Sequence, residues 1–227
     1  MAGLLRWGQR MLDSNWELAS GDVAHTIEVL NYSNQVNVIE ALVRLLMQHH
    51  PVGDSGCEGC PTLSVVKEFH RTATLFLLEK PGQYRGAGED VSVYKDGLVV
   101  HQPPPHPDFE AALDQFHDEL LKGWATFDHV GVAAFTLWFV NWVHPFKNGN
   151  GRTARAFSYA CLSLKMGIVI PGSPTVIDLI MDQREEYEAS LSEADKGYAE
   201  SQRPNLGRLE TFIEALLIQQ LSSIDVE

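Results

Sequence analysis

The chain has 227 residues, of which 44% are hydrophobic and 21% charged, a composition typical of a folded globular protein and not of a disordered one. Its formal net charge of −13 argues against nucleic-acid binding, because a polyphosphate backbone requires a broad basic surface. The strongest apolar run, residues 130–143, is too short to cross a bilayer, and residues 1–10 lack the apolar stretch of a signal peptide. We therefore expect no membrane partner and a cytoplasmic location.

One amphipathic helix is predicted in the N-terminal part of the chain. Apolar residues recur at helical spacing over residues 35–48, and Ser33 or Asn34 is suited to cap the start of this helix. Residues 51–61 then contain three glycines, two prolines and two cysteines, a composition typical of a loop. We place a domain boundary there, which gives the following division: a helical extension over residues 1–60, one main domain over residues 61–221, and a tail over residues 222–227.

The cysteines do not indicate a disulfide framework. Cys57 and Cys60 are separated by two residues, with histidines before and after them, which would permit a small zinc site or a redox pair. Tetrahedral zinc requires four ligands, and these histidines have no zinc-finger spacing. A glycine-rich connecting loop is the simpler interpretation, and Cys161 is expected in the core because apolar residues surround it.

A short β-hairpin is predicted ahead of the middle of the chain. Helical periodicity covers residues 63–78, after which apolar residues flank an Asp-Gly turn between residues 91 and 100. An Asp-Gly pair between two such runs is typical of a hairpin. Three consecutive prolines then exclude further strand or helix before a helix over residues 107–122.

The second half of the chain predicts a helical bundle. Residues 131–143 are apolar nearly all round, which indicates a central helix, and Pro145 ends it. Another apolar helix follows Arg152 and stops at Gly167, and the last helix covers residues 206–221. The acidic residues around 184–195 are expected on a solvated helix face. The predicted fold class is all-α, with the hairpin as its only sheet.

The most informative segment is a loop with the sequence HPFKNGNGR at residues 144–152. A histidine whose pKa is near neutrality can take a proton from a hydroxyl group, which makes His144 a candidate general base. The small residues before the next helix can turn backbone N–H groups toward a phosphate; they are Gly149, Asn150 and Gly151. Arg152 and Arg155 lie three positions apart on that helix and could hold phosphate oxygens.

This loop resembles the signature of the Fic family, which reads His-Pro-Phe, a variable residue, an acidic residue, then Gly-Asn-Gly-Arg and a further arginine three positions on. The resemblance implies a Fic-type helical bundle and transfer of AMP from ATP to a Tyr, Thr or Ser hydroxyl of a protein, with His144 as the general base. The order of hairpin, proline run and helix ahead of the loop is also similar to Fic proteins. The resemblance covers residues 61–221.

In Fic proteins the hairpin forms a flap beside the active site, which implies the same role for residues 91–100 here. The edge of a hairpin can receive an extended segment of a protein substrate as an added strand. The residues expected to contact the substrate are Val93, Tyr94, Leu98, Val99 and Val100. The sequence leaves open the target protein and whether the chain forms a homodimer or binds a regulatory partner.

One position departs from the Fic pattern, at the residue that holds the metal ion in most members. Asn148 stands where an Asp or Glu would hold Mg²⁺ against the phosphates, and Mg²⁺ normally binds through one or two carboxylates. We expect weakened Mg²⁺ binding. Two alternatives follow: a Fic-type transferase that uses another donor, such as another nucleotide, CDP-choline or ATP as phosphate donor, and a catalytically weak protein that binds a peptide and a nucleotide.

Many Fic proteins carry an inhibitory helix with Ser or Thr, three residues, then Glu and Gly or Asn. The predicted N-terminal helix lacks this pattern, because Glu40 follows Val36 at the hydroxyl position and precedes Ala41. We expect Glu40 to be a solvated or locally paired carboxylate. Tyr187 is expected to pack within the bundle, with a place beside the nucleotide base as the alternative.

Overall fold

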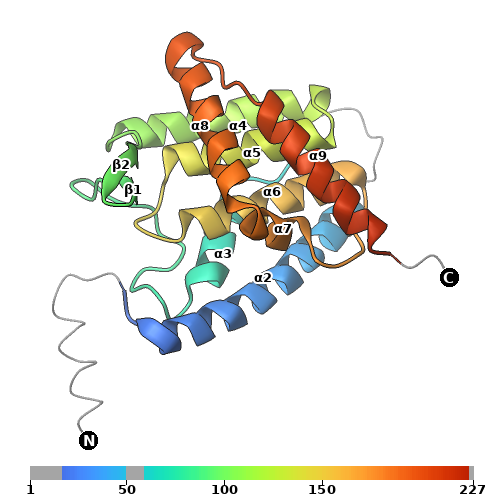
Figure 1. Ribbon diagram of the computed structural model, residues 1–227, viewed down its shortest axis with the longest axis horizontal. Coiled ribbons are helices and arrows are strands. Elements are labelled where there is room, and N and C mark those ends of the chain that lie inside the picture. Colours follow the sequence, from blue (N-terminus) through green and yellow to red (C-terminus); the bar gives the residue numbers. More distant parts are fainter. Residues whose placement is uncertain (1–16, 50–58, 225–227) are drawn as a thin grey trace, which may run out of the picture.

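The computed structural model describes residues 17–49 and 59–224, and in this part of the chain it is a bundle of helices with one two-stranded antiparallel sheet (Figure 1). The predicted all-α class with a short hairpin is therefore confirmed. The elements are α2 (Gly21–His49), α3 (Leu63–Thr74), β1 (Val93–Lys95), β2 (Leu98–His101), α4 (Asp108–Thr126), α5 (His129–Val143), α6 (Asn150–Met166), α7 (Val176–Asp182), α8 (Arg184–Ser201) and α9 (Gly207–Ser222).

The antiparallel pair α5 and α6 forms the centre of the bundle. Helix α5 also packs against α4, α8 and α9, whereas α6 packs against α2, α3 and α7. Because α5 has neighbours on all sides, its sequence can be apolar all round. Its aromatic residues belong to the core as predicted: Trp138 is 1% exposed, and the ring of Phe139 stacks on that of Phe116 at 4.1 Å. Cys161 on α6 is also fully buried, as expected.

Helix α2 begins at Gly21, well before the predicted start near residue 35. The prediction was wrong because two residues on the buried face of the helix are polar. Asn31 donates to the carbonyl oxygen of Leu75 at 2.8 Å, and Gln35 donates to that of Phe69 at 3.0 Å. Both amides are thus hydrogen-bonded to carbonyl groups of α3 or of its C-cap, so burial needs no apolar side chain there. Asn34, expected as a cap, lies exposed in the middle of the helix.

Two further differences concern the end of α3 and the number of helices. Helix α3 ends at Thr74 and not near residue 78, because Leu75 is extended and Phe76 has a positive φ of 61°. The short helix α7 was not predicted; Thr175 and Asp178 cap it reciprocally. The loop expected at residues 51–61 lies mostly outside the described residues, as does Cys57.

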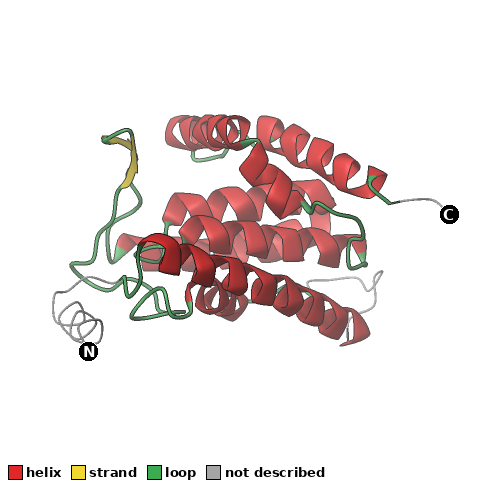
Figure 2. Ribbon diagram, turned by 60° about the horizontal axis from the view of Figure 1, so that its bottom comes forward, coloured by secondary structure: helices red, strands yellow, loops and turns green. Residues whose placement is uncertain are grey.

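The hairpin projects from one end of the helical body (Figure 2). Strands β1 and β2 pair antiparallel, with Lys95 opposite Leu98, which confirms the predicted hairpin. Its turn residues Asp96 and Gly97 both have positive φ, 50° and 78°, which an Asp-Gly pair tolerates and which matches the twist of the strands. Among the described helices, none has the length and apolar character that crossing a bilayer demands.

Candidate functional site

His144 occupies the C-terminal cap of α5 with a left-handed backbone, φ 48° and ψ 60°. Its Nδ1 lies 3.0 Å from the carbonyl oxygen of Asn141. A carbonyl oxygen can only accept, so Nδ1 carries the proton and Nε2 keeps a lone pair. Burial lowers the pKa of His144 to about 4, and the nearby charges of His101 and Arg85 act in the same direction. The ring is therefore neutral at physiological pH, with one nitrogen able to accept a proton.

Arg85 holds the backbone on which His144 sits. Its side chain is 2% exposed, and its Nε donates to the carbonyl oxygen of His144 at 3.0 Å. Its Nη2 donates to the carbonyl oxygens of Val143, at 3.4 Å, and of Pro104, while Nη1 pairs with Asp90 at 3.1 Å. One guanidinium group thus binds the last carbonyl groups of α5, which have no partner within the helix. No local sequence pattern indicates this role, and it was not predicted.

Phe146 and Asn150 fix the shape of the loop. Phe146 is fully buried, and its ring stacks on His70 at 3.7 Å. The Asn150 side chain, 1% exposed, accepts from the Phe146 N–H at 2.9 Å and donates to the Phe146 carbonyl at 2.7 Å. Both polar ends of Asn150 are therefore used inside the loop. His70 adds a third support, with Nε2 lying 2.9 Å from the carbonyl oxygen of Asn148.

The start of α6 has the geometry of an anion site. Gly149, at the N-cap, has a φ of 80°, and a Cβ there would lie 2.6 Å from Cγ2 of Thr74, so only glycine fits. The first intrahelical bond runs from the Thr153 N–H to the Gly149 carbonyl at 3.0 Å. The N–H groups of residues 150–152 precede that bond and have no partner within the helix. These are the groups that bind phosphate at helix N-termini.

Arg152 and Arg155 extend this anion site toward α2. Both line a cavity of about 570 Å³ between α2, α6 and α7. The Nε of Arg155 is buried and has no hydrogen-bond partner among the described residues. Arg152, by contrast, pairs with Glu28 of α2, with Nη1 and Oε1 2.9 Å apart. A buried, unpaired guanidinium N–H is a strong donor for a phosphate oxygen.

Glu28 is a site residue that was not predicted, because the predicted helix began after it. Through its contact with Arg152, the N-terminal helix supplies a carboxylate beside the arginines. Ala24 lies four positions before Glu28 and Val29 directly after it, so the inhibitory-helix pattern remains incomplete. Glu40 is half-buried, and its Oε2 lies 3.8 Å from Nη2 of Arg44, which is the locally paired state that was expected.

Asn148 does not fit the role of a metal ligand in its observed arrangement. Its Oδ1 accepts from the Gly149 N–H at 2.6 Å, and its Nδ2 donates to Oε1 of Glu17 at 3.0 Å. The side chain offers no anionic oxygen, and its neutral oxygen is already engaged, whereas Mg²⁺ prefers carboxylates and phosphates. Among the described residues no group of three or more His, Cys, Asp or Glu side chains is arranged to bind a metal.

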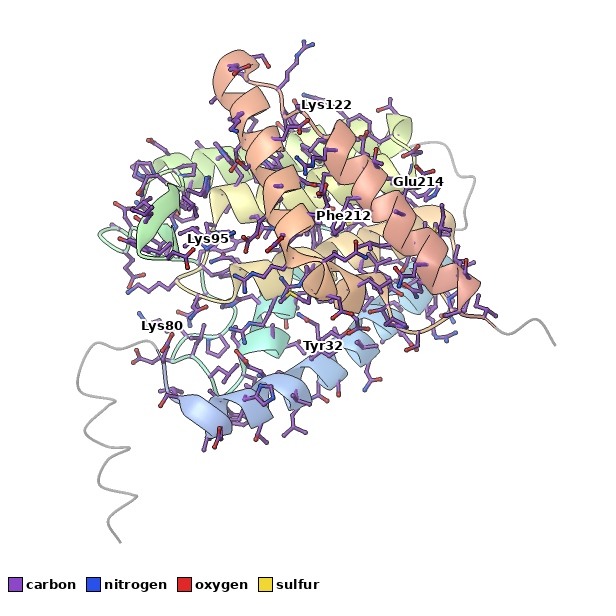
Figure 3. All side chains as sticks on the ribbon, viewed as in Figure 1. Tyr32, Lys80, Lys95, Lys122, Phe212 and Glu214 are labelled. Atoms are coloured by element: carbon purple, nitrogen blue, oxygen red, sulfur yellow. The ribbon has the colours of Figure 1, made fainter. Side chains whose placement is uncertain are left out.

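A second cavity, of about 560 Å³, lies between the hairpin, α5 and α8, and His144 lines it. Lys95 of β1, labelled in Figure 3, pairs with Glu188 of α8 at 2.5 Å, and both residues line this cavity. His101 of β2 contacts the carbonyl oxygen of Trp142 at 2.7 Å and lies 3.4 Å from Asp195. The hairpin is thus tied to the bundle on both strands. His144 and the two arginines line different cavities.

Two expectations about α8 are settled by these contacts. Asp195 is half-buried and accepts from Nε1 of Trp138 at 2.9 Å, so the acidic face of α8 is not solvated throughout. Burial raises the pKa of Asp195. Tyr187 is 6% exposed and its hydroxyl accepts from Asn141 at 2.9 Å, so it packs within the bundle as expected.

The residues expected to bind a substrate lie on the hairpin and are largely exposed. Leu98 is 72% and Tyr94 64% exposed, and Val99 and Val100 are more than half exposed. Val93 and Val100 also line the cavity that contains His144. The hairpin therefore carries an apolar surface that continues into that cavity.

Part of this chain is similar to a known protein family. Residues 61–162 match the model of the Fic/DOC family. The hairpin and the loop at residues 144–152 both lie in the matched part. A protein named Protein adenylyltransferase Fic, from Nematostella vectensis, is 35% identical over 98 residues, which is 43% of this chain and 21% of that protein. The chain thus spans about a fifth of the length of that relative.

Solved structures of Fic proteins share the fold. A Fic family protein from Desulfovibrio desulfuricans G20 aligns with a TM-score of 0.61 and 19% identity, over 96% of this chain and 58% of that one. Fic-1 from C. elegans (residues 134–508) aligns with a TM-score of 0.64 and 20% identity, over 94% of this chain and 55% of that one. At these identities the likeness concerns the fold. Because both alignments also include the region before residue 61, α2 belongs to the shared architecture.

Proposed function

We propose that this chain transfers AMP from ATP to a Tyr, Thr or Ser hydroxyl of a protein. The observation that carries the proposal is the 3.0 Å contact between Nδ1 of His144 and the carbonyl oxygen of Asn141. The hydrogen bond from Nδ1 to the Asn141 carbonyl leaves Nε2 as an acceptor, which a general base requires. A neutral imidazole beside a helix N-terminus that can bind phosphate is the arrangement that hydroxyl attack on a phosphorus atom needs.

In the proposed reaction the donor phosphates bind the N–H groups of residues 150–152 and the Arg155 side chain. Nε2 of His144 takes the proton of the target hydroxyl as its oxygen forms a bond to the α-phosphorus. The bond from that phosphorus to the β-phosphate bridging oxygen breaks, and pyrophosphate leaves. The helix N-terminus and the arginine stabilise the charge that develops on the phosphate oxygens. Asn148 has no assigned role in this reaction, and Mg²⁺ binding stays a prediction.

The cavity between the hairpin and α8 is the proposed site of the nucleoside. Its volume of about 560 Å³ suits a small ligand, and it brings the bound group next to His144. The exposed hairpin residues Tyr94, Leu98 and Val99 would then hold an extended segment of the protein substrate at the edge of the same cavity. Both reactants would meet at His144.

The proposal is tested by intact mass spectrometry of the protein after incubation with ATP and Mg²⁺, alone and with candidate proteins. We expect an added AMP on this chain or on a target, and none with His144→Ala. The variant should keep the circular dichroism spectrum of the native chain, because His144 follows the last residue of α5 and lies in the loop. Nucleotide binding without labelling of any protein would instead support a catalytically weak binding protein.

A second candidate function is Fic-type transfer from another donor. Asn148 favours it, because its side chain binds the Gly149 N–H and would offer no carboxylate to a Mg²⁺ ion. Parallel incubations with ATP labelled at the α- or γ-phosphorus and with labelled CDP-choline distinguish these reactions. Label from the α-phosphorus of ATP supports AMP transfer, label from the γ-phosphorus supports phosphate transfer, and label from CDP-choline supports phosphocholine transfer.

A further inference from the structure

Helix α2 carries a largely apolar stripe that is mostly exposed in the described part of the chain. The helix runs along one edge of the molecule (Figure 1). Four large apolar residues of the stripe are exposed: Val23 by 57%, Leu30 by 60%, Val38 by 37% and Leu45 by 52%. At helical spacing these residues form one continuous row with three others. The full stripe consists of Val23, Ile27, Leu30, Asn34, Val38, Ala41 and Leu45.

The stripe is separate from the face that α2 buries in the bundle. That face contains Asn31, Gln35, Ile39 and Val43. At about 100° per residue, the centres of the two faces are roughly 120° apart around the helix axis. A helix packed on the stripe would therefore lie beside α2 without displacing any contact of the core.

The spacing of the stripe is symmetric. Its seven positions are separated by 4, 3, 4, 4, 3 and 4 residues, so the series reads the same in both directions about Asn34. In an antiparallel pair centred on Asn34, Leu30 of one copy meets Val38 of the other, Ile27 meets Ala41, and Val23 meets Leu45. A two-fold interface requires this reciprocity: if residue i of one copy contacts residue j of the other, then residue j of the first copy contacts residue i of the second.

We propose that two copies of this chain associate through antiparallel pairing of their α2 stripes. The alternation of three and four residues is the spacing of coiled-coil contacts. The two Asn34 side chains would face each other at the two-fold axis, where their amide groups can exchange hydrogen bonds. A single polar position of this kind sets the register of paired helices.

The charges around the stripe favour a second copy as the occupant. The chain has a net charge of −13, yet the positions that border the stripe on its solvent side are Thr26, Ser33, Asn37 and Arg44, none of them acidic. In the antiparallel register Arg44 of one copy lies near Thr26 of the other, so no like charges are opposed. Asp22 and Glu40 lie on the far side of the helix, about 120° from the stripe centre.

The contact has the size of a weak, reversible interface. Residues 23–45 extend over about 33 Å at 1.5 Å per residue. Two helices paired over this length bury on the order of 1,000 Å² in total, near the lower end for specific complexes. We therefore expect a dimer that dissociates on dilution.

The first test measures the oligomeric state of the full chain by sedimentation velocity over a range of concentrations. The native chain should dimerise, and Leu30→Glu and Val38→Lys should each raise the dissociation constant at least tenfold. An equimolar mixture of these two variants should dimerise again, because the glutamate introduced in one copy would meet the lysine introduced in the other. Ile218→Glu, at a 59% exposed apolar position on α9, is the matched control and should leave dimerisation unchanged.

The second test determines the register by disulfide crosslinking in a Cys57→Ser, Cys60→Ser background. Asn34→Cys should crosslink to itself, whereas Leu30→Cys should crosslink only when mixed with Val38→Cys. Self-crosslinking of Leu30→Cys would indicate parallel helices and overturn the proposed pairing. A native chain that stays monomeric at every concentration, or a dimer that Leu30→Glu leaves unchanged, would overturn it as well.

Discussion

Oε1 of Glu28 lies 2.9 Å from Nη1 of Arg152, so α2 supplies a carboxylate to the anion site at the start of α6. A bound phosphate would compete with that carboxylate for the same guanidinium group. Glu28→Ala should therefore bind ATP about tenfold more tightly, since a charged hydrogen bond of about 1.5 kcal/mol corresponds to that factor. Isothermal titration calorimetry measures the affinity, and Glu40→Ala on the same helix is the control. Equal affinities for the two variants would contradict the competition.

The pH dependence of labelling reports on His144. The neutral ring is the base, and its pKa is lowered to about 4, so the active form predominates at every pH well above that value. The initial rate of AMP transfer should stay level between about pH 5.5 and pH 8 and fall only in more acidic solution. A rate that halves near the ordinary histidine pKa of about 6.5 would show that His144 is not buried as described.

The free energy of unfolding should decrease as the pH falls below about 6.5, the ordinary pKa of histidine. Burial lowers the pKa of His70 and of His144 to about 4 in the folded chain, so between that value and about 6.5 the unfolded chain binds more protons. Each histidine should remove roughly 2 kcal/mol of unfolding free energy between pH 7 and pH 5. Urea denaturation at both pH values measures the loss, which should be about half as large in His70→Gln.

Gly149 should tolerate no side chain. Its φ of 80° strains any other residue, and a Cβ would lie 2.6 Å from Cγ2 of Thr74. Gly88 has a nearly equal φ of 78°, but a Cβ added there would have no atom within 4 Å. Gly88→Ala therefore measures the backbone strain alone, without a steric clash. We expect thermal and urea denaturation to show about 1 kcal/mol of destabilisation for Gly88→Ala and about 3 kcal/mol for Gly149→Ala. Thr74→Ser, which removes Cγ2, should recover part of the difference.

Asn148→Asp should strengthen metal binding at the loop. The change introduces the carboxylate that Mg²⁺ prefers and replaces the hydrogen bond to Glu17 with a repulsion that a cation relieves. Binding of Mn²⁺, followed by electron paramagnetic resonance in the presence of ADP, should tighten about tenfold or more relative to the native chain. Asn148→Ala is the control for loss of the existing hydrogen bonds. An unchanged Mn²⁺ affinity in Asn148→Asp would place the metal away from residue 148.

The helical parts that are apolar on their buried faces could be predicted from the sequence. The helix at residues 129–143 and the Asp-Gly hairpin have patterns that local propensity alone determines. The N-terminal half of α2 could not be found this way, because Asn31 and Gln35 occupy its buried face and hydrogen-bond to carbonyl groups of α3, far away in sequence. Burial of polar residues depends on partners that no local pattern reveals.

The loop at residues 144–152 shows the same division. Its histidine, glycines and arginine are visible in the sequence because their spacing is short and chemically specific. The tautomer of His144, the guanidinium of Arg85 beneath it and the carboxylate of Glu28 beside Arg152 depend on contacts that the folded chain creates. Local sequence thus determined which groups are present and where the backbone turns. Only tertiary packing decided which of them are buried, paired or left with a free lone pair, because these properties are set by neighbours that the fold brings together.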